Sequence, residues 1–529
     1  MNLDPNSDRD STNDSPSENQ RPPTRDDFYQ AELAQYASPQ TDSTTKPVLA
    51  STTANDESLV RLSWSGYLAW AFVLSITGFM IAIVAIGQFN TTQQVGGNAS
   101  ANDLMQIQLQ GKMLVGQEHM FPGQAEAALT PELDSGPYEQ RICYSILINE
   151  FKGPTDAIEH LEKTDKAAAA ANLELTEEQK RLRGLIGKLV KQYEDGDLDS
   201  DSLPGPDQLF IEDRLQWIGK LALHPKGTPD TVARTKLEEF GGTMMMTMIG
   251  VMILGALMLM VGFLVSILFA ILIGTGRLKS NFLNRKYNHN IYIETFAIWM
   301  GLFFGSSIFL SIFGGNFIDE KSSLMIQPFI FFGSLVVLCW PIVRGISFKQ
   351  MREDIGWTAE KPLTNLTASV PAYLAILPYL LPCVIFVVIA MSIVAGFQSA
   401  PEFSRQAGPS HPIQEEIMLG GTTTIVLVFL TACVCAPIVE ETMFRGVLYR
   451  HLRDISGVWR RWISVVFAAL LNGLIFASIH PQGMFGIPML TMLAIGFSLT
   501  REWRGSLVSS MVMHFIHNAL VTCVMLTIL

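Results

Sequence analysis

Long apolar stretches alternate with polar segments along most of this chain, and the apolar stretches set its architecture. A helix needs about 20 apolar residues to cross the hydrocarbon core of a bilayer. The stretches lie at 61–89, 243–275, 291–314, 324–343, 370–397, 418–451, 462–480, 484–500 and 506–529. The pattern predicts an all-α, polytopic membrane helix bundle of about nine transmembrane helices. The short stretch at 484–500 could be re-entrant or tilted.

Two long polar segments interrupt this pattern. Residues 1–60 are rich in Ser, Asp, Asn, Thr and Pro and cannot bury a core, so we expect a disordered tail without a signal peptide. Residues 90–241 hold Leu182, Leu185 and Ile186 at helical spacing after a helix start at Thr176. This insert is therefore predicted to be a mostly helical extramembrane domain, and no catalytic constellation is visible in it. The second to fourth transmembrane helices then occupy 242–345.

Basic residues gather in every second connection between the apolar stretches. They are Arg277, Lys279, Arg285 and Lys286, then Arg344, Lys349 and Arg352, then Arg450, Arg453, Arg460 and Arg461, and finally Arg501 and Arg504. Cytoplasmic loops of membrane proteins carry an excess of Lys and Arg. The N-terminus is therefore predicted to be cytoplasmic, and the 90–241 domain, the loops at 315–323 and 398–417 and the C-terminus are predicted to lie outside.

Composition agrees with a membrane protein and excludes some functions. Hydrophobic residues make up 48% of the chain and charged residues only 16%, and the net charge of -12 argues against a nucleic-acid partner. Most of the six cysteines lie in apolar stretches and none has zinc-knuckle or CxxC spacing, so no disulfide framework is expected. The acidic composition and the absence of organelle signals fit an integral protein of a bacterial inner membrane.

Ionisable side chains within membrane helices cost a few kcal/mol and therefore need a reason. The last apolar stretches contain three polar groups, namely Glu440, Glu441 and Arg445 in APIVEETMFRG, Phe476 and His480 in NGLIFASIHP, and His514 and Asn518 in MVMHFIHNAL. Glu441 and Arg445 are four residues apart and can pair on one helix face. Judged singly, the groups could also be an ion pair at a helix end, an interfacial histidine and a polar helix contact.

Taken together, the three groups supply what hydrolysis of a peptide bond requires. Glu440 could act as general base for a water molecule, and His480 could hold the same water and later protonate the leaving amine. His514 and Asn518 could donate hydrogen bonds to the developing oxyanion. Helix lengths add one condition, since Glu440 and His480 meet only if the helix at 462–480 is tilted or begins deeper in the cytoplasm.

The ordered motifs resemble those of a known family. The spacings Glu440-Glu441-x-x-x-Arg445, Phe476-x-x-x-His480 and His514-x-x-x-Asn518 are similar to the three signature motifs of the CPBP family. That family includes the CAAX prenyl endopeptidases of eukaryotes, bacteriocin-processing (Abi-type) proteins and many bacterial homologues. The resemblance covers about residues 346–529, including MREDIGWT ahead of the stretch at 370–397.

The resemblance implies an α-helical intramembrane protease core and a role for each motif residue. Glu440 would be the catalytic base with His480 beside it, His514 and Asn518 would form the oxyanion side, and Glu441, Arg445 and Phe476 would support them. It favours chemistry without a cofactor. Zinc stays open as an alternative, with Glu440, His480 and His514 as ligands.

The expected partners are the lipid bilayer and a membrane-tethered protein or peptide substrate. Two other functions stay open. The chain could be a catalytically inactive adaptor or immunity-type protein on the same scaffold, or a proton-coupled transporter, although residues 243–400 show no second copy of the motifs. The oligomeric state and the role of the 90–241 domain are not encoded in a visible motif.

Overall fold

The structure is a computed structural model, and it describes residues 62–528 except 94–98, 131–133, 284–289, 311, 313–319, 359, 398–402 and 405–420. The tail predicted for residues 1–60 lies outside the described residues. The described residues all belong to one compact unit, Leu59–Leu529.

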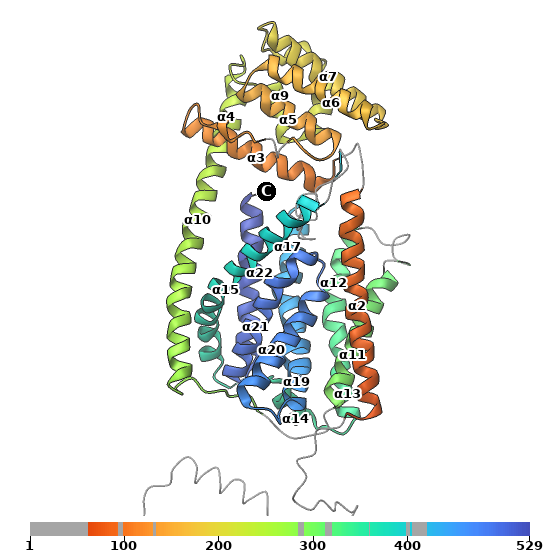
Figure 1. Cartoon of the computed structure of the whole chain (residues 1–529), viewed down its shortest axis with the longest axis vertical. Coiled ribbons are helices and arrows are strands. Elements are labelled where there is room, and N and C mark those ends of the chain that lie inside the picture. The colour runs from red at the N-terminus through yellow and green to blue at the C-terminus, as the bar shows by residue number, and fades with distance from the viewer. Residues whose placement is uncertain are drawn as a thin grey trace, which may run out of the picture. The chain divides into compact units, whose positions relative to one another are not determined.

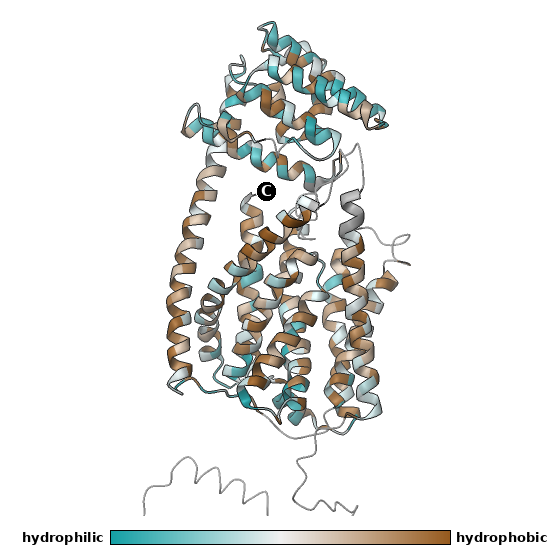
Figure 2. Ribbon diagram, viewed as in Figure 1, coloured by the Kyte–Doolittle hydropathy of each residue, from teal (hydrophilic) through white to brown (hydrophobic). Residues whose placement is uncertain are grey.

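Every regular element of more than one residue is helical in the described part of the chain, which confirms the all-α prediction (Figure 1). Nine helical segments there are long and apolar enough to cross a membrane, as predicted. They are α2 (Trp64–Gln93), α10 (Thr231–Gly274), α11 (Asn290–Phe309), α12 (Glu320–Ser334) continuing to α13 (Cys339–Val343), α15 (Pro362–Phe397), α17 (Thr422–Phe429) continuing to α19 (Tyr449–Ile455), α20 (Arg461–Ser478), α21 (Ile487–Arg504) and α22 (Leu507–Ile528). Figure 2 shows how strongly apolar these long helices are.

The span from Thr422 to Ile455 is not a uniform α-helix. Between α17 and α19 it contains the π-helical segment η5 (Leu430–Cys435), the short α18 (Ala436–Glu440) and a second π-helical segment, η6 (Glu441–Leu448). Pro437 gives a physical reason for the first, because proline has no N–H and its ring crowds the carbonyl one turn earlier. A wider π turn absorbs that disturbance, and such turns are frequent at functional sites.

Aromatic side chains connect the earlier spans to the span that holds Glu440. The ring of Phe296 on α11 meets Phe444 at 5.2 Å, and Phe444 meets Phe476 on α20 at 5.0 Å, both edge to face. Trp299 packs against Phe444 from the same helix at 5.7 Å. Edge-to-face pairs of this kind add to the free energy of burial, so the position of Phe476 is fixed partly from outside the motif region.

The polar insert forms a helical domain with its own core. Its helices are α3 (Ala101–Met120), α4 (Ala125–Ala128), α5 (Tyr138–Phe151), α6 (Pro154–Ala170), α7 (Glu177–Glu194), α8 (Gly205–Leu215) and α9 (Trp217–Leu223). On α7 the spacing gives the expected result, since Leu182, Leu185 and Ile186 are buried. Thr176 caps this helix with a reciprocal bond pair to Gln179. The long α10 extends from this domain into the bundle, with α3 packed along it.

Candidate active site

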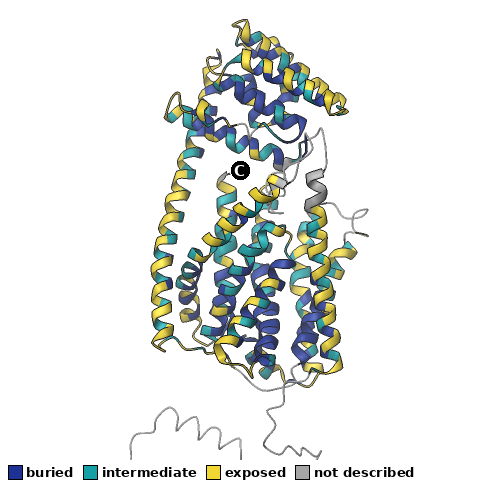
Figure 3. Cartoon of the chain, in the orientation of Figure 1, coloured by how far each residue is buried: buried dark blue, intermediate teal, exposed yellow. Residues whose placement is uncertain are grey.

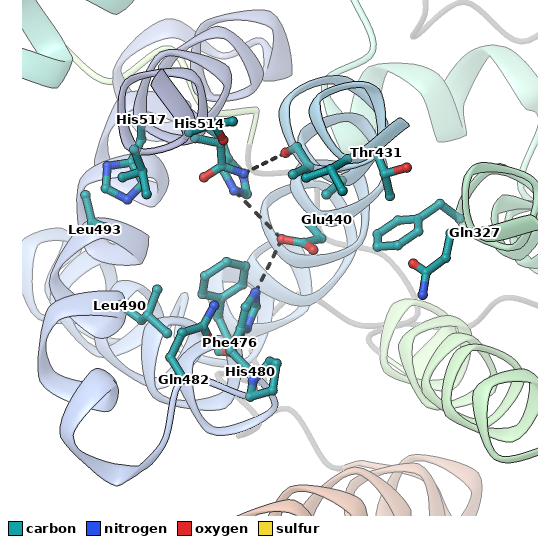
Figure 4. Close-up of a pocket in the computed structure, with 18 of the residues that line it drawn as sticks. Gln327, Thr431, Glu440, Phe476, His480, Gln482, Leu490, Leu493, His514 and His517 are labelled. Atoms are coloured by element: carbon teal, nitrogen blue, oxygen red, sulfur yellow. Dashed lines mark hydrogen bonds and ion pairs between the residues drawn. The ribbon is translucent and has the colours of Figure 1, made fainter. Parts of the chain in front are cut away.

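The three motif groups meet at one cavity, as Figure 4 shows. Glu440 is the last residue of α18, and its Oε2 lies 3.6 Å from Nε2 of His480 and 3.9 Å from Nε2 of His514. His480 lies two residues beyond the end of α20, and His514 lies within α22. The structure thus brings together Glu440 and His480, the pair for which helix lengths alone left a condition.

Phe476 orients His480 in two ways. Nδ1 of His480 donates a hydrogen bond to the backbone carbonyl of Phe476 over 2.6 Å, which explains the spacing of four residues. The two rings also pack against each other, with centroids 4.2 Å apart. Because a carbonyl oxygen only accepts, the proton of a neutral His480 sits on Nδ1, and its Nε2 faces Glu440 as an acceptor.

Glu441 forms a buried ionic centre behind Glu440. Its Oε1 accepts from Nη1 of Arg445 at 2.9 Å and from Nδ1 of His514 at 3.0 Å. Glu441 and Arg445 are fully buried. The guanidinium of Arg445 lies over the rings of Phe476 and Phe497, 4.5 and 5.1 Å from their centroids, where cation–π attraction offsets part of the loss of water. The predicted ion pair is present, and it fixes the His514 ring.

Asn518 is placed differently from the other motif residues. It lines the cavity, but its Nδ2 donates to the carbonyl of Ala432 over 2.7 Å. Ala432 belongs to η5, where the π-helical turn changes the usual backbone bonding. One amide hydrogen of Asn518 is therefore bonded to the span that carries Glu440, and the second is the one that a ligand would use.

The cavity has a volume of about 400 Å³, within the usual range for ligand pockets. Glu440, His480, His514 and Asn518 all line it, and most of its remaining wall is apolar. Three further lining side chains escaped the sequence analysis. Gln327 comes from α12, Gln482 from the turn after His480, and Phe497 from α21, where its ring stacks on His514 at 5.0 Å. Neither glutamine nor phenylalanine stands out by type or spacing, so the sequence held no signal for them.

The segment MREDIGWT supports the site from outside the bundle. It forms α14 (Phe348–Ile355) and a turn in which Gly356 has φ +85°, a conformation that suits glycine. A Cβ at Gly356 would also lie 2.5 Å from the guanidinium of Arg501. The next residue, Trp357, donates from Nε1 to the hydroxyl of Thr442 over 3.0 Å. This segment is thereby joined to the residue that follows Glu441.

Within the described residues, no cluster of three or more His, Cys, Asp or Glu side chains has the geometry of a metal site. Glu440, His480 and His514, the alternative zinc ligands named from the sequence, border the same cavity but do not form such a cluster. Two of the three, His480 and His514, already donate from Nδ1, which leaves Nε2 as the coordinating atom in each case.

The apolar spans define an integral, multi-pass membrane protein. Residues 422–520 match the family model described as Type II CAAX prenyl endopeptidase Rce1-like, which is consistent with the CPBP family. The matched region contains all three motifs, so this part of the chain is similar to a CAAX-protease domain. The match does not extend to α14 and α15, where the sequence resemblance began. No curated protein and no solved structure was found to match the chain.

Proposed function

We propose that this protein is an intramembrane endopeptidase that hydrolyses peptide bonds of membrane-tethered substrates. The observation that carries the proposal is the pairing of Glu440 Oε2 with His480 Nε2 at 3.6 Å, inside a cavity large enough for a peptide segment. The CAAX-protease-like match over residues 422–520 supports the same chemistry. The proposed roles follow from the hydrogen bonds that each side chain already makes.

Glu440 and His480 are arranged to activate a water molecule. His480 donates its Nδ1 proton to Phe476, so Nε2 of the neutral ring and the Glu440 carboxylate both face the cavity as acceptors. A water that donates one hydrogen to each would turn its lone pairs toward a substrate carbonyl. Glu440 takes a proton as the water oxygen bonds to the carbonyl carbon.

His514 is placed to stabilise the oxyanion that this attack creates. Its Nδ1–H is held by Glu441, so it donates to an oxyanion from Nε2 when the ring is a doubly protonated imidazolium. Two carboxylates, Arg445 and this imidazolium together carry two negative and two positive charges, which suits an apolar surrounding. The C–N bond then breaks, and the proton taken from water passes through Glu440 and His480 to the leaving amine.

The decisive experiment compares membranes that contain the wild-type protein with membranes that contain Glu440→Gln. New N-termini of membrane proteins, read by mass spectrometry, should appear with the wild type and vanish with Glu440→Gln. The matched control is Glu360→Gln, a carboxylate removed at an exposed position outside the bundle. Equal cleavage by Glu440→Gln and the wild type would reject the mechanism. If none of the three proteins produces new N-termini, the result would favour an adaptor role for the scaffold.

A further inference from the structure

The catalytic cavity extends along one half of the bundle. In the span Thr422–Ile455 it is lined between Val428 and Glu440, and in the span Leu507–Thr527 between His514 and Met525. In both spans these residues lie on the side of the helix away from the basic loops, because one helix ends and the other begins at those loops. Both of these spans therefore line the cavity with the half that lies away from the basic loops.

The three other helices that line the cavity also contribute residues from the half away from the basic loops. The cavity touches α12 at Leu324, Gln327 and Phe331, in the first half of the span Leu324–Val343, which ends at a basic loop. On α20, which starts at the basic loop, the cavity touches Phe476 near the end and the turn at 480–482. On α21 it touches the stretch from Leu490 to Phe497, before the basic residues at the end of that helix.

The half of the bundle next to the basic loops is filled by buried ion pairs. Arg450 lies 3.0 Å from Asp454 and 3.7 Å from Asp354, and Arg453 lies 3.2 Å from Glu502. None of these side chains is more than 7% exposed, and none lines the cavity. Figure 3 shows the same asymmetry, with buried positions concentrated at the end of the bundle that holds α14 and α19. A peptide cannot reach Glu440 from this side without displacing that layer.

The helical insert lies on the side toward which the cavity extends. The insert follows α2 and precedes α10, at the ends of these helices that are remote from the basic loops. Phe403, in the connection ahead of α17, is buried in the core of the insert at 1% exposure. Its ring packs on Tyr138, and the guanidinium of Arg141 lies 4.2 Å above it. The insert thus also holds Phe403, which belongs to the connection between α15 and α17.

The cavity wall indicates what kind of segment would enter. Apart from Glu440 and the histidines, the lining side chains are uncharged, and many are apolar, such as Val428, Leu490 and Val521. Gln482 adds a specific feature, because its Oε1 is buried and has no hydrogen-bond partner among the described residues. Gln482 is also one of the polar side chains that line the cavity, and a side-chain amide can hydrogen-bond the backbone of a peptide. An apolar, extended peptide satisfies both the wall and this oxygen.

We infer that the cavity admits an apolar peptide segment from the membrane face that holds the α3–α9 insert, opposite the basic loops and so at the outer face. This inference rests on the proposed protease function for its use of the cavity. The side of access relative to the basic loops follows from the geometry, and its assignment to the outer face follows from the rule that basic loops are cytoplasmic. Substrates would be proteins that present an apolar cleavable segment at the outer face.

Access can be tested without catalysis. In Glu440→Gln, a cysteine is placed at Val521 in the cavity, at Asp213 on the insert, or at Lys349 beside the basic loops. The last two are exposed reference positions. Intact cells and inside-out vesicles are treated with a membrane-impermeant maleimide, and mass spectrometry identifies each labelled residue, so the native cysteines can stay. Val521→Cys should be labelled in intact cells together with Asp213→Cys. Labelling only in inside-out vesicles together with Lys349→Cys, or from neither side, would overturn the inference.

A second experiment uses the active protein. Two single-span reporters carry the same apolar cleavable segment, one at the outer face and one at the inner face. The outer reporter should be cleaved at least tenfold faster, and preference for the inner reporter would contradict the inference. If neither reporter is cleaved, the proposed protease function fails, and the maleimide experiment still decides the direction of access.

Discussion

The indole of Trp70 donates a hydrogen bond to Nε2 of His451 over 3.0 Å, and this bond joins the first span to the span that carries Glu440. The two residues are far apart in the chain, and Trp70 lies outside the region that matches the CAAX-protease family model. Their rings are also close, with centroids 5.6 Å apart. The first helix is therefore part of the fold that supports the site and not merely an anchor for the insert.

Trp70→Phe should lower stability without removing catalysis. The substitution takes away the donor to a fully buried imidazole, and a lost hydrogen bond of this kind costs about 1 to 3 kcal/mol. Unfolding in detergent, followed by helix content, measures the change. Trp64→Phe is the matched control, because Trp64 is 77% exposed and should change little. Equal stability of the two variants would show that the Trp70–His451 hydrogen bond does not contribute to the stability of the fold.

Arg445→Met should be severely destabilising, by about 3 to 5 kcal/mol, because it leaves the Glu441 carboxylate buried without the guanidinium that pairs with it. The double variant Glu441→Gln/Arg445→Met should recover part of that loss, since the neutral amide that replaces the carboxylate can still accept from His514. Unfolding of the single and double variants tests this. A double variant that is less stable than Arg445→Met would refute the assignment of the cost to an unpaired charge.

Gln482→Leu should weaken substrate binding more than turnover. If the buried Oε1 accepts from the substrate backbone, its loss raises KM by about five- to tenfold and leaves kcat within about twofold. Steady-state cleavage of a reporter peptide separates the two constants. The control is Gln350→Leu on α14, remote from the cavity lining. A fall in kcat with an unchanged KM would assign Gln482 to the chemical step instead.

The insert should become less stable at acidic pH, because Asp134 becomes protonated. Burial alone would raise the pKa of this carboxyl, but the hydrogen bond from His160 at 2.9 Å and the nearby positive charges outweigh it and lower the pKa. A depressed pKa stabilises the folded state above the unfolded pKa of about 4, and that contribution is lost as the pH falls through the lower folded value.

Hydrogen exchange of the α5 and α6 amides in the full-length protein measures this dependence. Between neutral pH and about pH 3, protection in the wild type should fall more steeply than in Asp134→Asn, which is already less protected at neutral pH. Asp213→Asn, at an exposed position, should follow the wild type. Parallel pH profiles for the wild type and Asp134→Asn would contradict the prediction.

The sequence was sufficient for the spans, and it indicated that the motif residues need polar partners. An apolar stretch of bilayer length predicts a membrane helix whatever packs against it. An ionisable side chain such as Glu440 or His514 is costly in lipid, so it needs polar partners. The spacing of four residues also predicted the Glu441–Arg445 pair, which the structure places at 2.9 Å. These are local signals that one segment carries by itself.

The parts that escaped prediction depend on contacts between distant segments. Phe497 looks like an ordinary apolar residue until α21 brings it against His514 and Arg445. Gln327 reaches the cavity from a helix outside the family match, and no motif surrounds it. The hydrogen bond of Asn518 to Ala432 required the π-helical turn of η5, which hydropathy does not reveal. Packing between distant segments determines the position of each of these side chains, and no single stretch of sequence predicts such packing.

The π-helical segment η5 makes the backbone around Ala432 sensitive to the number of residues in the span that carries Glu440. A π turn holds one residue more than the α turn it replaces, so deleting a single residue between Leu430 and Cys435 would let the helix close to the regular form. Because the π turn takes up its extra residue within one turn, the residues on either side would keep their relative orientation after the deletion. Val428 and Glu440 would both stay on the cavity wall, but the backbone bonding around Ala432 would change. A shortened helix could therefore keep its full set of motif residues and still lose the hydrogen bond that holds Asn518.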